Sequence, residues 1–137
     1  MIAGVADTHV ALWYLFGDSR LSKSAKAFID QAANARRKVA LSVISLAETV
    51  YLIEKNRLPV SAYDDLKSAL ADPEHVLEEI PITADVVEAM RQVSRDAIPD
   101  MPDRIVAATA AYLRVPVISR FQILKSEPVR VATSAIN

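Results

Sequence analysis

The first eighteen residues, "MIAGVADTHVALWYLFGD" (1–18), contain the pattern that decides the fold. Residues 1–6 form a short apolar run that predicts a buried strand, and Asp7 ends that run. Residues 8–16 are apolar on nearly every side, which is typical of a helix buried over most of its surface, and Gly17 predicts its end. An acid therefore stands where a buried strand passes into a buried helix.

Short apolar strands alternate with helical segments along the rest of the chain. Strands of about five residues that are apolar on both faces are typical of a parallel sheet covered by helices. We therefore expect an α/β fold, an α/β/α sandwich with a central parallel sheet of about five strands, formed by residues 1–137 as a single domain. The further helices are predicted over 21–38, 45–58, 61–72, 84–97 and 102–114, and the further strands over 39–43, 75–82, 115–119 and 128–133.

Composition narrows the class of protein. Hydrophobic residues make up 52% of the chain and only two residues are glycine, which favours a compact globular fold. The absence of cysteine excludes disulfides and thiolate metal sites, and it fits a reducing compartment. The N-terminus lacks a basic stretch followed by an apolar run, and no apolar run reaches the roughly 20 residues that span a bilayer. We expect a cytoplasmic protein with no membrane partner.

Charge gives little indication of a nucleic-acid partner. The formal net charge is −1, so a global basic field is excluded. Arg36, Arg37 and Lys38 form the only compact basic cluster in the sequence. This cluster is either a local contact for nucleic acid or a solvated helix end, and we favour the helix end.

Acidic residues follow the predicted strands. Asp7 follows the first strand, and Glu48 lies one turn into the helix that follows the second. In "PDMPDRIVAATA" (99–110), Asp100 and Asp103 stand three residues apart, just before a helix of small and branched apolar residues. Ligands of parallel α/β sheets bind at the carboxyl ends of the strands, so these acids are the first candidates for a functional site.

Each acid taken alone also has a purely structural explanation. Asp7 is suited to cap the following helix. Residues 45–48 have the S-x-x-E spacing of a capping box, in which Glu48 reaches back to the cap's amide. Asp100 is suited to cap its helix, and both Asp100 and Asp103 are suited to complement the helix dipole.

Taken together, the acids favour a metal site. Asp7 and Glu48 should meet at one edge of the sheet, and Asp103 is a candidate to join them. Carboxylates at such a short separation repel one another by roughly 4 kcal/mol per pair at an intermediate dielectric. Protons or a cation must therefore neutralise them. A set of oxygen ligands without His or Cys suits Mg²⁺ or Mn²⁺. The chemistry that such an ion supports is phosphodiester hydrolysis by an activated water.

Three segments in order carry a family resemblance: "VADTHVALWYLFGDSRLS" (5–22), "LSVISLAETVYLIEKNRL" (41–58) and "PDMPDRIVAATAAYLRVPVIS" (99–119). Together they resemble the PIN-domain ribonucleases, and in particular the VapC-like toxins of bacterial type II toxin–antitoxin systems. The resemblance implies a PIN-like fold, Mg²⁺- or Mn²⁺-dependent endoribonuclease activity on RNA, and restraint by a cognate antitoxin.

The resemblance also implies roles for particular residues. Asp7, Glu48 and Asp103 match the metal-binding catalytic acids, and Asp100 matches a nearby acid that assists as a metal ligand. The family usually has another Asp just beyond the fourth strand, and this chain either has Phe121 at that position or has lost the residue by a deletion. This departure predicts a site that holds one ion, or that holds it weakly.

Further residues are candidates for substrate contact. We assign Thr8, Arg104 and Ser119 to substrate binding, although Arg104 is equally suited to pair with Asp100. His9, one turn into its helix, is expected to be packed or hydrogen-bonded rather than catalytic.

The aromatic residues of the first helix indicate a partner surface. Trp13, Tyr14 and Phe16 cannot all face inward, so we expect one or two to be exposed, and exposed apolar patches often mark partner sites. We expect a homodimer that also binds an apolar segment of the antitoxin near Trp13 and Tyr51.

Two other functions compete with the ribonuclease. The missing acid at Phe121 favours a catalytically impaired PIN-like binding or scaffold module. A phospho-acceptor signalling domain of similar architecture is less well supported, since it would need paired acids after the first strand, where "VADTHV" (5–10) has only one.

Overall fold

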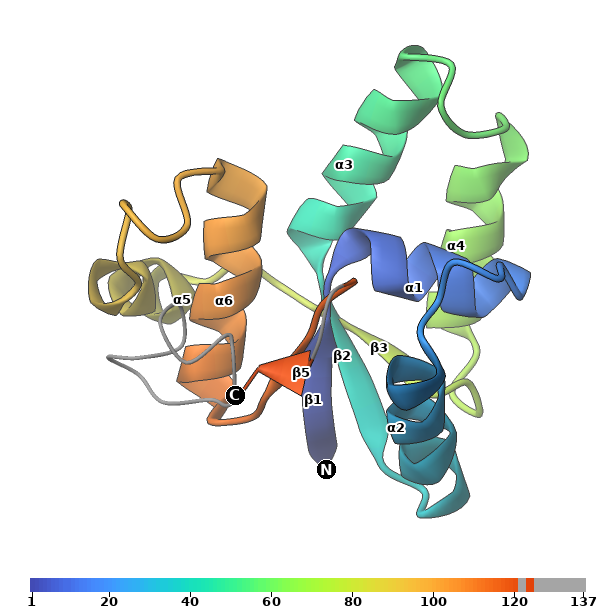
Figure 1. Cartoon of the computed structure of the whole chain (residues 1–137), viewed down its shortest axis with the longest axis horizontal. Coiled ribbons are helices and arrows are strands. Elements are labelled where there is room, and N and C mark those ends of the chain that lie inside the picture. The colour runs from blue at the N-terminus through green and yellow to red at the C-terminus, as the bar shows by residue number, and fades with distance from the viewer. Residues whose placement is uncertain (121–122, 125–137) are drawn as a thin grey trace.

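Five strands form one sheet in the order β3-β2-β1-β4-β5 (Figure 1). The computed structural model describes residues 1–120 and 123–124, so Phe121 and the strand predicted over 128–133 lie outside the described residues. β1 pairs in parallel with β2 and β4, and β2 pairs in parallel with β3. The strands are β1 (Ile2–Ala6), β2 (Lys38–Ser42), β3 (Leu77–Ile80), β4 (Val117–Ile118) and β5 (Ile123–Leu124).

The predicted α/β class and parallel sheet are confirmed for β1 to β4, but β5 is antiparallel to β4. Residues 119–122 connect these two strands, and a parallel pair needs a crossover of a dozen or more residues. Four residues are too few for such a crossover, so a parallel pairing of β5 with β4 is excluded. The described sheet therefore has four parallel strands and an antiparallel edge strand, and the fifth parallel strand expected over 128–133 stays a prediction.

Six α-helices and one 3₁₀ turn surround the sheet in the described part of the chain. The helix predicted over 84–97 is shorter than expected. It ends in the 3₁₀ turn, after which Val93 has extended backbone angles and the Ser94 hydroxyl accepts a hydrogen bond from the Ala97 amide. A serine that binds nearby backbone competes with the helix. The elements are α1 (Thr8–Phe16), α2 (Lys23–Asn34), α3 (Val43–Glu54), α4 (Ser61–Ala71), α5 (Ala84–Ala89), η1 (Met90–Gln92) and α6 (Met101–Leu113).

The ends of the helices show which capping predictions hold. Asp7 caps α1 as expected, and Gly17 ends that helix in the left-handed conformation (φ 64°). The capping box predicted at residues 45–48 is wrong, because α3 starts at Val43 and its cap is Ser42, whose side chain accepts from the Ile44 amide. β2 passes directly into α3, so Glu48 lies inside the helix and its side chain is available for other contacts.

The predicted basic cluster lies between α2 and β2. Arg36 adopts a left-handed backbone conformation (φ 57°) in the turn after α2. Lys38 begins β2, and its ammonium group donates hydrogen bonds to the backbone carbonyls of Pro73 and His75. Lys38 is therefore used to join two neighbouring segments.

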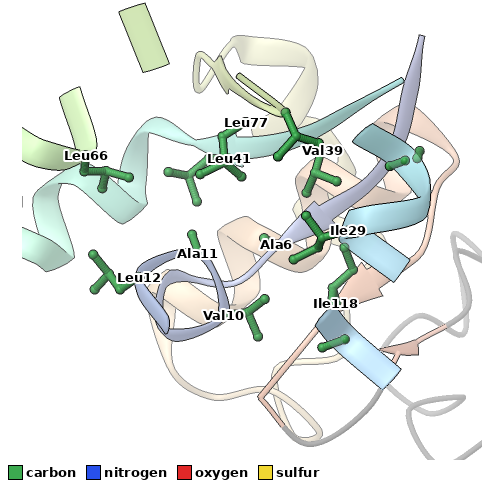
Figure 2. Close-up of a cluster of buried hydrophobic side chains, with 14 of the residues drawn as sticks. Ala6, Val10, Ala11, Leu12, Ile29, Val39, Leu41, Leu66, Leu77 and Ile118 are labelled. Atoms are coloured by element: carbon green, nitrogen blue, oxygen red, sulfur yellow. The ribbon is translucent and has the colours of Figure 1, made fainter. Parts of the chain in front are cut away.

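Helices cover both faces of the sheet and bury two layers of side chains. In Figure 1, α5 and α6 lie on one side of the strands, and α1, α2 and α4 lie on the other. Successive side chains of a strand point to opposite faces: Val39 and Leu41 of β2 belong to the layer under α1 and α2, whereas Ala40 belongs to the layer under α6. Figure 2 shows Val39 and Leu41 facing Ile29 of α2 and Val10 of α1. This core anchors the start of α1 at the end of β1.

No helix in the described part of the chain has the length and apolar character needed to cross a membrane.

Replacing Leu41 tests the larger core layer. Leu41 is fully buried on β2, so Leu41→Ala should lower the free energy of unfolding by about 2–5 kcal/mol, the usual loss when a leucine is removed from a core. Val60→Ala is the control, because Val60 is 82% exposed and its truncation should change little. Urea denaturation of both variants measures the difference, and equal stabilities would contradict the assignment of this layer as the core.

Candidate active site

The carboxyl ends of the central strands lie at one edge of the sheet, and three helices begin there. In Figure 1, α1 and α3 start at the upper ends of β1 and β2, with the upper end of α6 beside them. α3 packs against both α1 and α6. Asp7 follows β1, and its amide donates to the Ile118 carbonyl of β4 at 3.0 Å. The predicted acids therefore approach one another from segments far apart in the sequence.

Asp7 is a helix cap and a member of this group at the same time. Its Oδ1 accepts from the Val10 amide at 2.9 Å, and its Oδ2 accepts from the Arg120 amide at 3.0 Å. Burial raises the pKa of Asp7, while these two amides and the neighbouring His9 and Arg120 charges act in the opposite direction. A carboxylate can accept in about four lone-pair directions. The two hydrogen bonds from backbone amides therefore leave the Asp7 carboxylate able to bind a cation.

Glu48 is held from the first turn of α1. The Thr8 hydroxyl donates to Glu48 Oε1 and also lies 2.8 Å from the Ser45 hydroxyl oxygen. Thr8 is only 2% exposed, so it is placed to orient Glu48 rather than to meet a substrate directly. The pKa of Glu48 is raised by burial first and then by the charges of the other three acids, whereas the Thr8 hydrogen bond lowers it.

Asp100 and Asp103 lie at the start of α6. Asp100 caps the helix, since its Oδ1 accepts from the Asp103 amide at 3.1 Å, which confirms the structural explanation for Asp100. Both residues are exposed. Partial burial of its carboxyl group and the charges of Asp100 and Asp7 raise the pKa of Asp103, and the Arg120 charge lowers it. The charge of Asp103 therefore interacts with those of Asp7, which follows β1, and Glu48 of α3.

The four acids are close enough to perturb one another, but they do not form a closed ligand set. Within the described residues, no group of three or more His, Asp or Glu side chains has a geometry that would hold a metal ion as it stands. The donor set itself fits a hard divalent cation, because every candidate ligand is a carboxylate oxygen. The raised pKa values of Glu48 and Asp103, to which neighbouring carboxylates contribute, show negative charge that a cation would neutralise.

The remaining predicted residues have different surroundings. The Arg104 guanidinium lies 3.1 Å from the Met90 carbonyl and 3.4 Å from the Val93 carbonyl, so it ties α6 to the end of η1. These contacts do not include the alternative pairing with Asp100, and the assignment of Arg104 to substrate binding stays a prediction. Ser119 is half-buried immediately after β4.

Sequence reasoning missed Arg120. The Arg120 backbone amide donates a hydrogen bond to Asp7, and a guanidinium nitrogen of Arg120 lies 3.0 Å from Nδ1 of His9. Burial, followed by the Arg120 charge, lowers the pKa of His9, which is half-buried and hydrogen-bonded as expected. The only signal for Arg120 in the sequence is its place directly after a predicted strand.

Comparison with known proteins identifies the family. A model of the PIN domain family matches residues 5–121, and the chain belongs to this family. This chain has the same fold as a chain in the crystal structure of VapBC2 from Rickettsia felis, which is bound to a DNA fragment from the VapBC2 promoter. The match has a TM-score of 0.61 and 18% sequence identity, and it covers 85% of this chain and 86% of that one. No curated protein matches the chain.

Neutralising single acids tests the electrostatic strain. A raised pKa means that the folded state holds its proton more tightly than the unfolded chain does. Each such acid therefore lowers stability as the pH rises through its folded pKa. Glu48→Gln and Asp103→Asn should raise the free energy of unfolding at pH 7 in the absence of metal. The gain should shrink as the pH falls toward about 4, the ordinary pKa of these groups.

Urea denaturation with EDTA, repeated between neutral and acidic pH, measures this gain. Glu74→Gln is the control, because Glu74 is exposed in the turn before β3, away from the four acids. If both site variants lost stability at every pH, their hydrogen bonds would outweigh the repulsion.

Proposed function

We propose that this protein is a divalent-metal-dependent endoribonuclease, the toxin of a VapC-like toxin–antitoxin pair that acts in the cytoplasm. One observation carries the proposal: four carboxylates from three separate segments approach one another at the carboxyl edge of a parallel sheet. Membership of the PIN domain family supports a nuclease. RNA as the substrate and hydrolysis as the reaction are our further assignments, and they rest on the chemistry that a divalent cation held by carboxylates supplies.

The metal we propose is Mg²⁺ or Mn²⁺. Asp7, Glu48 and Asp103 would hold it, with Asp100 as an additional carboxylate at the rim. When bound, such an ion offsets the repulsion among the carboxylates, polarises a phosphodiester and lowers the pKa of an attacking water.

The chain itself prepares two of these ligands. The amides of Val10 and Arg120 fix the Asp7 carboxylate, and the Thr8 hydroxyl fixes that of Glu48. Mutating hydrogen-bond partners that orient metal ligands in this way typically lowers metal affinity or activity by about 10–100-fold. Asp103 is exposed at the start of α6, so its carboxylate is open to a cation and to substrate from solvent.

A second candidate function is a catalytically impaired PIN-like binding or scaffold module. Two observations favour it: the acids of the described residues are not gathered into a ligand set, and Phe121 stands where the resemblance leads us to expect an acid. A module of this kind would bind RNA or a protein partner without cutting RNA.

We also propose a cognate antitoxin and a second copy of the chain as partners. One solved structure with this fold is VapBC2 with promoter DNA, which supports an antitoxin as a partner. Val50 and Tyr51 of α3 are 39% and 55% exposed, and Phe16 at the end of α1 is 43% exposed. Trp13 is half-buried, so an apolar partner segment fits α3 better than it fits the centre of α1.

Removing single carboxylates tests the catalytic proposal. Asp7→Asn and Asp103→Asn should each lower Mn²⁺-dependent cleavage of single-stranded RNA at least about a hundredfold while the fold survives, because each removes a metal ligand. Asn keeps a side-chain oxygen that can accept the Val10 amide, so the cap of α1 is preserved. Gel assays with Mg²⁺, Mn²⁺ and EDTA measure cleavage, and Glu74→Gln should cleave like the natural protein. RNA binding without cleavage under any metal condition would favour the impaired module.

The partner proposal is tested with the small protein encoded by the neighbouring gene. Tyr51→Asp should weaken that complex at least about tenfold, because it places a charge in an apolar contact. Tyr112→Asp is a matched control, since Tyr112 is 48% exposed on α6. Calorimetry measures affinity, and light scattering measures oligomeric state. A strictly monomeric chain that ignores this protein at micromolar concentration would contradict both partners.

A further inference from the structure

Four side chains form a continuous row that starts at the acids and follows α1. We call Arg120, His9, Trp13 and Arg20 the α1 row. A guanidinium nitrogen of Arg120 lies 3.0 Å from His9 Nδ1, and the His9 and Trp13 ring centroids are 5.6 Å apart. The Arg20 guanidinium lies 5.2 Å from the centroid of the Trp13 ring. His9 and Trp13 are four residues apart on α1, so they share one face of the helix.

The far end of the row is held in place and open to solvent. Arg20 donates to both carboxylate oxygens of Asp18, at 3.1 and 2.8 Å, and its side chain remains 69% exposed. The same contacts lower the pKa of Asp18 to about 2, so the pair is charged at neutral pH. Arg20 is therefore held beside Trp13 while most of its side chain remains exposed to solvent.

A hollow lies beside Trp13. It has a volume of about 490 Å³ and is lined by Trp13, Tyr14, Lys26 and His75 among others. Volumes of about 300–1,000 Å³ are usual for ligand pockets. The row therefore passes an aromatic ring that borders a space large enough for a planar group.

Neither the core nor the proposed metal site accounts for this arrangement. α1 is anchored to the core by Val10, Ala11 and Leu12, which are 0–2% exposed, whereas His9 and Trp13 are half-buried. The carboxylates repel phosphate, and the net charge of −1 attracts none, so a nucleic acid must be attracted locally. Arginines and aromatic rings are the groups that bind single-stranded nucleic acids, through phosphate contacts and base stacking, and the α1 row has two rings between two arginines.

We propose that the α1 row is a subsite for single-stranded RNA, in which Trp13 stacks on a base while Arg20 and Arg120 contact phosphates on either side of it. This inference rests on the proposed function, which it deepens by defining where the strand next to the cleaved phosphate lies. The strand would run from the acids along α1 toward Arg20, with the hollow beside Trp13 receiving the stacked base.

Trp13 is the only tryptophan of the chain, so its fluorescence reports directly on the row. An unlabelled single-stranded RNA of mixed sequence is added to the full chain in EDTA, which prevents metal-dependent cleavage. We expect saturable quenching of Trp13, since a stacked base changes the ring's surroundings. Unchanged fluorescence at RNA concentrations that saturate binding, or the absence of any binding, overturns the proposal.

Variants measured by fluorescence anisotropy with fluorescein-labelled RNA complete the test. Trp13→Ala should raise Kd between about fivefold and a hundredfold, and Trp13→Phe should raise it less, because a ring remains for stacking. Arg20→Ala should weaken binding and reduce the slope of log Kd against log salt by about one. Arg91→Ala is the matched control, because Arg91 is an exposed arginine that is also paired with a carboxylate, that of Glu88.

The outcomes separate this inference from the proposed function. Thermal melts establish folding, and the exposed Arg20 keeps the test valid if Trp13→Ala does not fold. If the protein cleaves RNA with Mn²⁺ but the variants of the α1 row bind RNA with the same Kd as the unmutated protein, the subsite is overturned and the proposed function is not. Natural RNA affinity with lost binding of the neighbour-encoded protein also overturns it, and would make the row a protein contact. Absence of cleavage by the natural protein contradicts the proposed function, while quenching and the Kd differences would still support the row.

Discussion

The two hydrogen bonds accepted by the Asp7 carboxylate hold the site together. One comes from the Val10 amide at the start of α1, and the other comes from the Arg120 amide just after β4. Because β1 and β4 are adjacent parallel strands, a single side chain joins the helix that leaves one strand to the loop that leaves the next. The proposed metal site and the α1 row both begin at this junction.

The price of gathering carboxylates at this edge is stability, and the rest of the fold must offset it. Burial and mutual repulsion raise the pKa of Glu48 and of Asp103, so their charged forms oppose folding. Side chains such as Leu41 and Ile29 on one face of the sheet, and Val106 on the other, are almost completely buried and provide the compensating hydrophobic free energy. A cation bound only by the folded state would add to stability by mass action.

Local features of the sequence predicted most of the fold and most of the candidate site. Apolar strands followed by acids placed Asp7 and Glu48 at the same sheet edge, because strand ends meet there in any parallel sheet. The predictions failed where two local rules competed. The spacing from Ser45 to Glu48 fits a capping box, yet the end of β2 makes Ser42 the cap. The helix predicted over 84–97 ends early because Ser94 binds backbone, and the edge strand β5, which was not predicted, is antiparallel to β4 because only four residues separate the two strands.

The sequence by itself determined the alternation of strands and helices, the burial of the strands and the places of the acids along the chain. These depend on hydrophobic periodicity and on capping, which act over a few residues. Only the tertiary structure decided that Thr8 holds Glu48, that Arg104 binds backbone carbonyls rather than Asp100, and that Arg120 meets Asp7 and His9. Arg120 is 113 positions from Asp7. Which polar groups meet over such a separation depends on strand order and helix packing, and no local pattern encodes either of them.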